Sequence, residues 1–97
     1  MPMSDADFES VQNHYEQPVL AAVSALAVRY PGLRQELLPD VACVALNRLP
    51  PRYIRHAVDL AFYMTDKERM DNERSIDDAV RHAFEFVQAR SAMRARR

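Results

Sequence analysis

Glycine occurs only once in this chain of 97 residues, at Gly32. Tight turns and β-hairpins depend on glycine, because it adopts backbone angles that other residues avoid. Hydrophobic residues make up 48% of the chain and charged residues 28%, which is typical of a folded globular domain. A chain of this length forms one small domain. We therefore expect an all-α fold of three to four helices.

The first helical stripe runs from Ser4 to about Arg29. Its apolar residues are spaced by three and four, as on one face of a helix: Phe8, Val11, Tyr15, Val19, Ala22, Val23 and Leu26. Asn13 with Glu16 forms a possible capping box inside the stripe, so a second helix could begin there. Pro18 either bends one long helix or lies early in the second of two. We expect one bent helix.

A second helix begins at Pro39 or Asp40, since proline is favoured in the first turn. Pro50 forces its end, because the residue before a proline avoids helical angles. Its apolar face contains Val41, Ala42, Ala45, Leu46 and Leu49, and its polar stripe contains Asp40, Asn47 and Arg48. Cys43 follows the apolar run, and we expect it to be a small core residue.

The segment 53–65 fits either an extended strand or a short helix, and the sequence leaves both open. Two capping boxes, Thr65 with Glu68 and Ser75 with Asp78, could start the last helix. The second would give Asp78 a role at a helix start. The apolar stripe of this helix contains Ile76, Val80, Ala83, Phe84 and Val87.

We assign residues 4–92 to a single domain and residues 93–97 to a basic, flexible tail, because the final residues lack an apolar stripe. We also expect a homodimer. The broad apolar second helix and several aromatic residues are more apolar surface than three or four helices readily cover. These aromatic residues are Phe62, Tyr63, Phe84 and Phe86.

Charge and motifs exclude several classes of function. The net charge of −1 makes nucleic acid an unlikely partner. The single cysteine, Cys43, cannot form an internal disulfide, which fits a cytoplasmic protein. The longest apolar run is too short to cross a bilayer, so no membrane association is expected. No Walker loop, nucleophile elbow or catalytic dyad occurs, so we expect no enzyme activity.

Positive charge gathers in the stretch ALNRLPPRYI, residues 45–54. The helix end and the two prolines hold Arg48 and Arg52 at a nearly fixed separation. Guanidinium groups bind phosphate bidentately and stack on aromatic rings, which favours a nucleotide site. The candidate ligand-binding residues are Asn47, Arg48, Pro50, Pro51, Arg52, Tyr53 and Arg55. In the alternative interpretation, these residues simply cap and end the second helix.

This stretch resembles the signature of the late-competence ComFB family, an Ala-Leu-Asn-Arg-Leu-Pro-Pro-x-Tyr core. The resemblance covers most of the chain and implies a small helical dimer, and several members are receptors for cyclic di-GMP. The matching positions are Asn47, Arg48, Pro50, Pro51 and Tyr53, whereas Arg52 and Arg55 are added on electrostatic grounds. Some members hold zinc in a cysteine-rich loop before the signature helix. Here that loop contains no cysteine, so we expect no zinc and no other cofactor.

The function expected from this resemblance is that of a non-enzymatic cytoplasmic receptor. It would bind cyclic di-GMP at the arginine turn and signal to an unknown downstream protein. The alternative is a structural or adaptor homodimer, in which the turn is a packed helix stop and no nucleotide binds.

Overall fold

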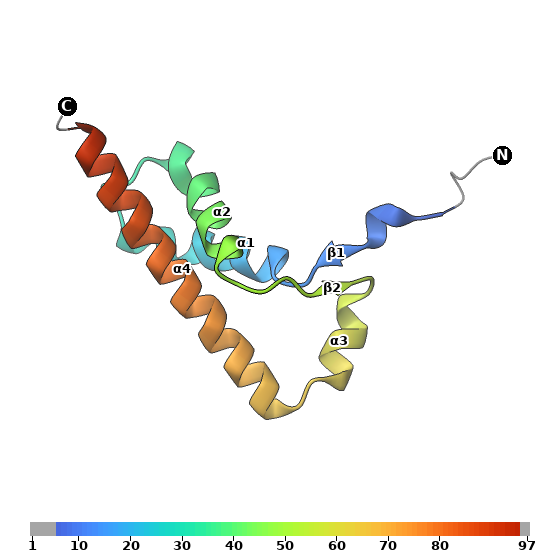
Figure 1. The fold of residues 1–97 in the computed structure, drawn as a ribbon. Helices are drawn as coiled ribbons and strands as arrows, with labels where there is room; N and C mark the ends of the chain where they lie inside the picture. The colour runs from blue at the N-terminus through green and yellow to red at the C-terminus, as the bar shows by residue number, and fades with distance from the viewer. Residues whose placement is uncertain (1–5, 96–97) are drawn as a thin grey trace.

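The computed structural model describes residues 6–95. Four α-helices account for most of them, and the only sheet in this part of the chain pairs two short antiparallel strands, with Gln12 opposite Ile54 and Asn13 opposite Tyr53. The elements are β1 (Gln12–Asn13), α1 (Glu16–Leu26), α2 (Leu38–Asn47), β2 (Tyr53–Ile54), α3 (Ala57–Tyr63) and α4 (Asp66–Ala95) (Figure 1). The all-α prediction is confirmed, and segment 53–65 is resolved into a strand followed by a short helix.

The prediction of one long bent helix at the start of the chain is wrong. A turn of 3-10 helix at Phe8–Ser10 and strand β1 come first, and α1 begins only at Glu16. The backbone N–H of Tyr15 donates to Asn13 Oδ1 (3.3 Å), and the Asn13 N–H donates to a Glu16 carboxylate oxygen (3.4 Å). These hydrogen bonds order the turn that precedes α1, and the second of the two predicted helix starts is the one used. Pro18 then lies in the first turn of α1, where proline is tolerated.

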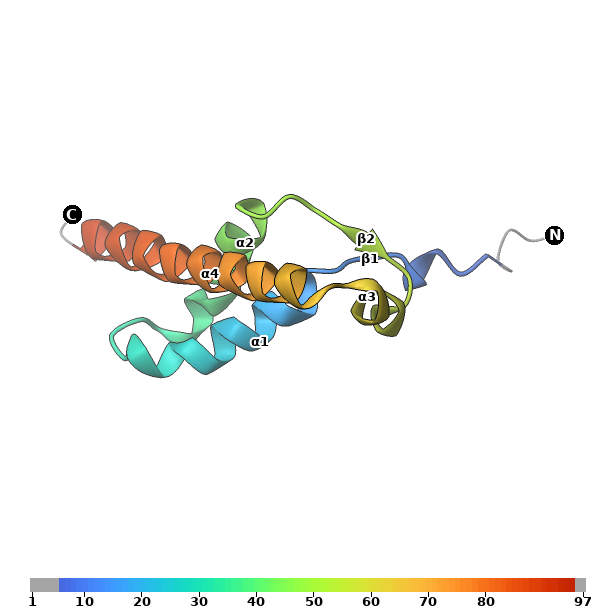
Figure 2. The same cartoon turned by 90° about the horizontal axis from the view of Figure 1, so that it is seen from below.

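The hydrophobic core lies where α1 and α2 pack against the middle of α4, from Ile76 to Val87 (Figure 2). Phe84 is fully buried and stacks on Tyr30, with ring centroids 4.5 Å apart and planes 5° from parallel. The loop leucines Leu33 and Leu37 also pack against this core. Its buried residues are Val19, Val23, Val41, Ala42, Ala45, Leu49, Ile76, Ala79, Val80, Ala83, Phe84 and Val87.

Helix α2 has the predicted buried and polar faces, except at Cys43. It starts at Leu38, one residue before the earliest predicted position, and Pro39 lies in its first turn. Cys43 was expected in the core but is exposed. Successive residues of a helix are rotated by about 100°, so the residue after Ala42 points away from the buried face.

Helix α4 begins at the first of the two predicted capping boxes. The Glu68 N–H donates to Thr65 Oγ1 (3.1 Å), a side-chain cap that satisfies one free donor of the helix. Asp78 therefore lies inside the helix rather than at its start. Residues 66–75 include no buried side chain, although they form the first third of α4. Helix α3 joins this exposed end and diverges from it (Figure 1).

The ends of the domain differ from the sequence prediction in one respect. Residues 93–97 were expected to form a flexible tail, but α4 continues as regular helix through Ala95. Residues 96 and 97, and the predicted helix start at Ser4, lie outside the described residues.

Candidate functional site

The arginine turn is fastened to the N-terminal strand. The backbone N–H of Arg52 donates to Asn13 Oδ1 (2.9 Å), and the backbone N–H of His14 donates to the Arg52 carbonyl oxygen (2.6 Å). Asn13 Oδ1 thus accepts hydrogen bonds from both Tyr15 and Arg52. Because the backbone of Arg52 is held in this way, only its side chain remains to be ordered by a ligand.

Arg48 lies at the C-cap of α2 and leans toward α4. Its Nη1 is 3.4 Å from Nε2 of His82. Within residues 6–95, neither Arg48 nor Arg52 forms an ion pair with a carboxylate. Both guanidinium groups are therefore free to bind an anion.

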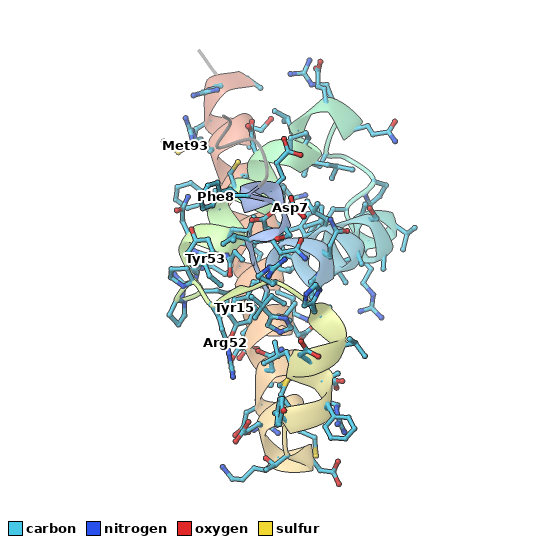
Figure 3. All side chains as sticks on the ribbon, turned by 90° about the vertical axis from the view of Figure 1, so that its right-hand side faces the viewer. Asp7, Phe8, Tyr15, Arg52, Tyr53 and Met93 are labelled. Atoms are coloured by element: carbon cyan, nitrogen blue, oxygen red, sulfur yellow. The ribbon has the colours of Figure 1, made fainter. Side chains whose placement is uncertain are left out.

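Two adjoining hollows separate the turn from α4. The first, here called the Arg48 hollow, has a volume of about 290 Å³ and is lined by Tyr15, Arg48, Leu49, Pro50, Ser75, Asp78 and Ala79. The second, the Arg52 hollow, has a volume of about 230 Å³ and is lined by Tyr15, Arg52, Met64, Glu68, Asp71, Asn72 and Ser75. Tyr15 and Ser75 line both, so one arginine of the turn lies on each side of this pair. Figure 3 shows Tyr15 and Arg52 close to one another in this region.

The structure separates the seven residues predicted to bind ligand. Arg48, Pro50 and Arg52 line the hollows. Asn47 instead donates its side-chain amide to the Cys43 carbonyl oxygen (3.0 Å), and Arg55 donates Nε to Ser10 Oγ (3.0 Å). Pro51 and Tyr53 also lie outside the lining, and Tyr53, on β2, is 68% exposed. Asn47 therefore fits the helix-capping interpretation, whereas the arginines at 48 and 52 fit the ligand interpretation.

Sequence reasoning missed the α4 wall of the site. Asn72, Ser75, Asp78 and His82 are spaced by three, three and four residues, so they form a polar stripe along one face of α4. This spacing was visible in the sequence, but only the buried stripe of the same helix was used. The sequence analysis identified Tyr15 only as a member of the first apolar stripe, although this residue lines both hollows.

His14 borders the same region. Its Nε2 is 3.0 Å from Nδ2 of Asn72, which ties β1 to α4. Burial lowers the pKa of His14 below its ordinary value, and the nearby charge of Arg52 lowers it further. The charge of Arg52 therefore disfavours the protonated form of the partly buried His14.

Two other possible kinds of site gain no support in the described part of the chain. Across residues 6–95, no three His, Cys, Asp or Glu side chains come together as a metal site requires. No helix in this range is long and apolar enough to cross a membrane.

Fold and site together define a small all-α domain that presents an arginine turn to the polar face of its longest helix. The sequence model of the family described as late competence development protein ComFB matches residues 12–91, so the chain belongs to the ComFB family. Searches of curated proteins and of solved structures found no match.

Proposed function

We propose that this protein is a non-enzymatic receptor for cyclic di-GMP and that the ligand binds in the Arg48 and Arg52 hollows. One observation carries the proposal. The two arginines, neither paired with a carboxylate within the described residues, open on adjoining hollows on either side of Tyr15 and Ser75. Cyclic di-GMP carries two phosphates, and two guanidinium groups can bind one each. The resemblance to cyclic di-GMP receptors of the ComFB family supports the same ligand.

Aromatic stacking supplies the second part of the proposed binding mode. Tyr15 lines both hollows and is partly buried, so its ring can stack on guanine at little cost in side-chain entropy. Tyr53 can cover the ligand from the solvent side, since its ring is already exposed. Each hollow alone is at or below the lower end of the usual range of about 300–1,000 Å³ for ligand pockets. The ligand therefore spans both.

The active form in this proposal is a homodimer in the cytoplasm. The radius of gyration is 16.4 Å, compared with about 13 Å for a compact domain of 100 residues. The accessible surface is 7429 Å², compared with about 5,700 Å² for a compact monomer of this size. The excess of about 1,700 Å² is roughly twice the area of about 800 Å² that a standard interface buries on each partner, so the chain has surface enough for a subunit interface.

A second copy of the chain would cover the apolar surface of α3 and the start of α4. Val58, Phe62, Tyr63 and Met70 are between 62% and 83% exposed there. Such a cluster of large exposed side chains marks an interaction surface. Ligand-dependent change at this surface would carry the signal to a downstream protein.

The competing proposal is a structural or adaptor dimer that binds no nucleotide. The hydrogen bond from Asn47 to the Cys43 carbonyl favours it, because that contact serves the helix end alone. In this case the arginine turn contributes to folding rather than to binding.

Calorimetric titration and thermal melting of Arg48→Ala and Arg52→Ala distinguish the two proposals. If the arginines bind phosphate, each substitution costs about 1.5–3 kcal/mol of binding, which weakens the affinity at least tenfold, and the melting temperature without ligand changes little. Arg94→Ala is the matched control, because Arg94 lines a separate hollow at the other end of α4. A lower melting temperature with unchanged nucleotide affinity, or no binding by the wild type, would favour the adaptor.

A further inference from the structure

The α4 wall of the Arg48 hollow contains a carboxylate that phosphate binding does not explain. Asp78 lies in the hollow together with Arg48, yet the two side chains form no ion pair. A carboxylate can only accept hydrogen bonds, and it repels phosphate. Its presence in a nucleotide site therefore points to a part of the ligand that donates hydrogen bonds.

Guanine presents such donors. Its Watson–Crick edge carries N1–H and the N2 amino group side by side, and both can bond to one carboxylate. Adenine has an acceptor at N1 and no amino group at position 2, so the same carboxylate would face a lone pair. A site built to bond a ligand N–H discriminates strongly against an analogue that lacks it.

Asp78 is the acidic residue that lines the Arg48 hollow, and unlike Asp77 and Asp71 it has a free side chain. Asp77 accepts from Arg81 Nε (2.8 Å), and Asp71 accepts from Lys67 Nζ (3.2 Å). Asp78 has no side-chain hydrogen bond or ion pair with any other described residue. Its carboxylate is therefore available to a ligand.

The position of Asp78 relative to Arg48 also suits a nucleotide. The Arg48 guanidinium lies beside His82, which is one helical turn beyond Asp78 on the same face of α4. Four residues of helix correspond to a rise of about 6 Å. A phosphate and the base of the same nucleotide are separated by the sugar, so the groups that bind them should lie several ångströms apart.

We propose that Asp78 reads the Watson–Crick edge of guanine and makes this protein prefer cyclic di-GMP to cyclic di-AMP. The inference rests on the proposed function, since it assigns base specificity to the same site. Arg48 then binds the phosphate, Tyr15 stacks on the base, and Asp78 selects it.

The test is the affinity of wild type, Asp78→Asn and Asp77→Asn for cyclic di-GMP and cyclic di-AMP, measured by calorimetric titration. Asparagine keeps the size of the side chain but adds a donor, which suits adenine. We expect Asp78→Asn to lower the ratio of the two affinities about tenfold or more, mainly through weaker cyclic di-GMP binding. Asp77→Asn removes the same charge one residue away and should leave the ratio unchanged. Melting curves check that both variants are folded.

Each result has one meaning for the inference. Wild type that binds cyclic di-GMP while Asp78→Asn keeps the guanine preference would overturn the role of Asp78 and leave the receptor proposal standing. An equal loss of preference in Asp77→Asn would also overturn it, because charge alone would then account for the effect. Wild type that binds neither dinucleotide would overturn the receptor proposal and this inference together.

Discussion

The first third of helix α4 and its middle lie in very different surroundings. From Ile76 to Val87 the helix packs against α1 and α2 and contributes six buried residues to the core. From Asp66 to Ser75 it has no buried side chain, and the adjoining α3 exposes large apolar residues. One continuous helix therefore joins a closed region, which contains the hydrophobic core, to an open region that lacks a partner within the described residues.

The difference shows which region of this small domain supplies stability and which region has surface left for binding. The closed region removes enough apolar surface from water to hold the fold together. In the open region, from α3 to Ser75, Leu60 is the one buried residue, so this region gains little stability from burial. Both hollows are at the boundary, with Ser75 shared between them.

The largest expected effect is in the closed region. Phe84→Ala removes a fully buried ring that stacks on Tyr30, and we expect a loss of about 3–5 kcal/mol in the free energy of unfolding. Phe86→Ala is the control, because it removes the same side chain from the same helix at a position that is 47% exposed. Its cost should be under about 1 kcal/mol. Urea unfolding measures both, and equal costs would show that the core is not where the structure places it.

The next effect concerns the open region. If a second copy covers α3, Phe62→Ala should weaken dimerisation by about 2 kcal/mol, the size of an interface hot spot. Light scattering over a range of protein concentrations measures the shift from dimer to monomer. The stability loss of this variant should also depend on concentration, whereas that of Phe84→Ala should depend on it much less. A wild type that is already monomeric at micromolar concentration would contradict the dimer.

A smaller effect is expected at the start of α4. Thr65→Ala removes the hydroxyl that accepts from the Glu68 N–H, which should cost about 1 kcal/mol. Because residues 66–75 lack buried contacts, the loss should appear as faster hydrogen exchange of the first turn rather than as global unfolding. Thr65→Ser keeps the acceptor and should exchange like wild type. Unchanged exchange in Thr65→Ala would mean that the cap does not hold this end.

The smallest expected effect is a pH dependence of stability caused by His14, which lies at the boundary between the closed and open regions. Its pKa is lowered in the folded protein by burial and then by Arg52, so the unfolded chain binds a proton more readily. Stability from this residue is therefore present above its ordinary pKa of about 6.5 and is lost as the pH falls through and below that value. His14→Gln should flatten the decline in melting temperature between about pH 7 and pH 5. An unchanged slope in this variant would assign the decline to other groups.

The sequence predicted the closed region better than the open one, and the reason is physical. The spacing of Val41, Ala45 and Leu49 reports burial directly, because apolar periodicity is imposed by the core. The early stripe through Phe8 and Val11 has the same spacing, yet these residues are exposed and lie outside the α-helices. Periodicity cannot distinguish a residue that meets the core from one that has nothing to pack against.

The sequence predicted the arginine side of the candidate site but not the side that α4 contributes. Arg48 and Arg52 stood out because two prolines and the absence of nearby acids mark the turn. Their α4 partners, such as Ser75 and Asp78, are more than 20 residues away in the sequence, and only tertiary packing brings them to the turn. The hydrogen bond from the Asn47 amide to the Cys43 carbonyl agrees with the alternative interpretation of the sequence, in which this residue caps the second helix.

The hydrogen bond between Asn13 and Arg52 has a consequence for the order in which the molecule assembles. It joins residues 39 positions apart, and the chain between them contains all of α1 and α2. Closing so long a loop is entropically costly until those helices have packed. We therefore expect the arginine turn to be completed late in folding, so that a chain whose core has not yet formed would lack the proposed ligand site.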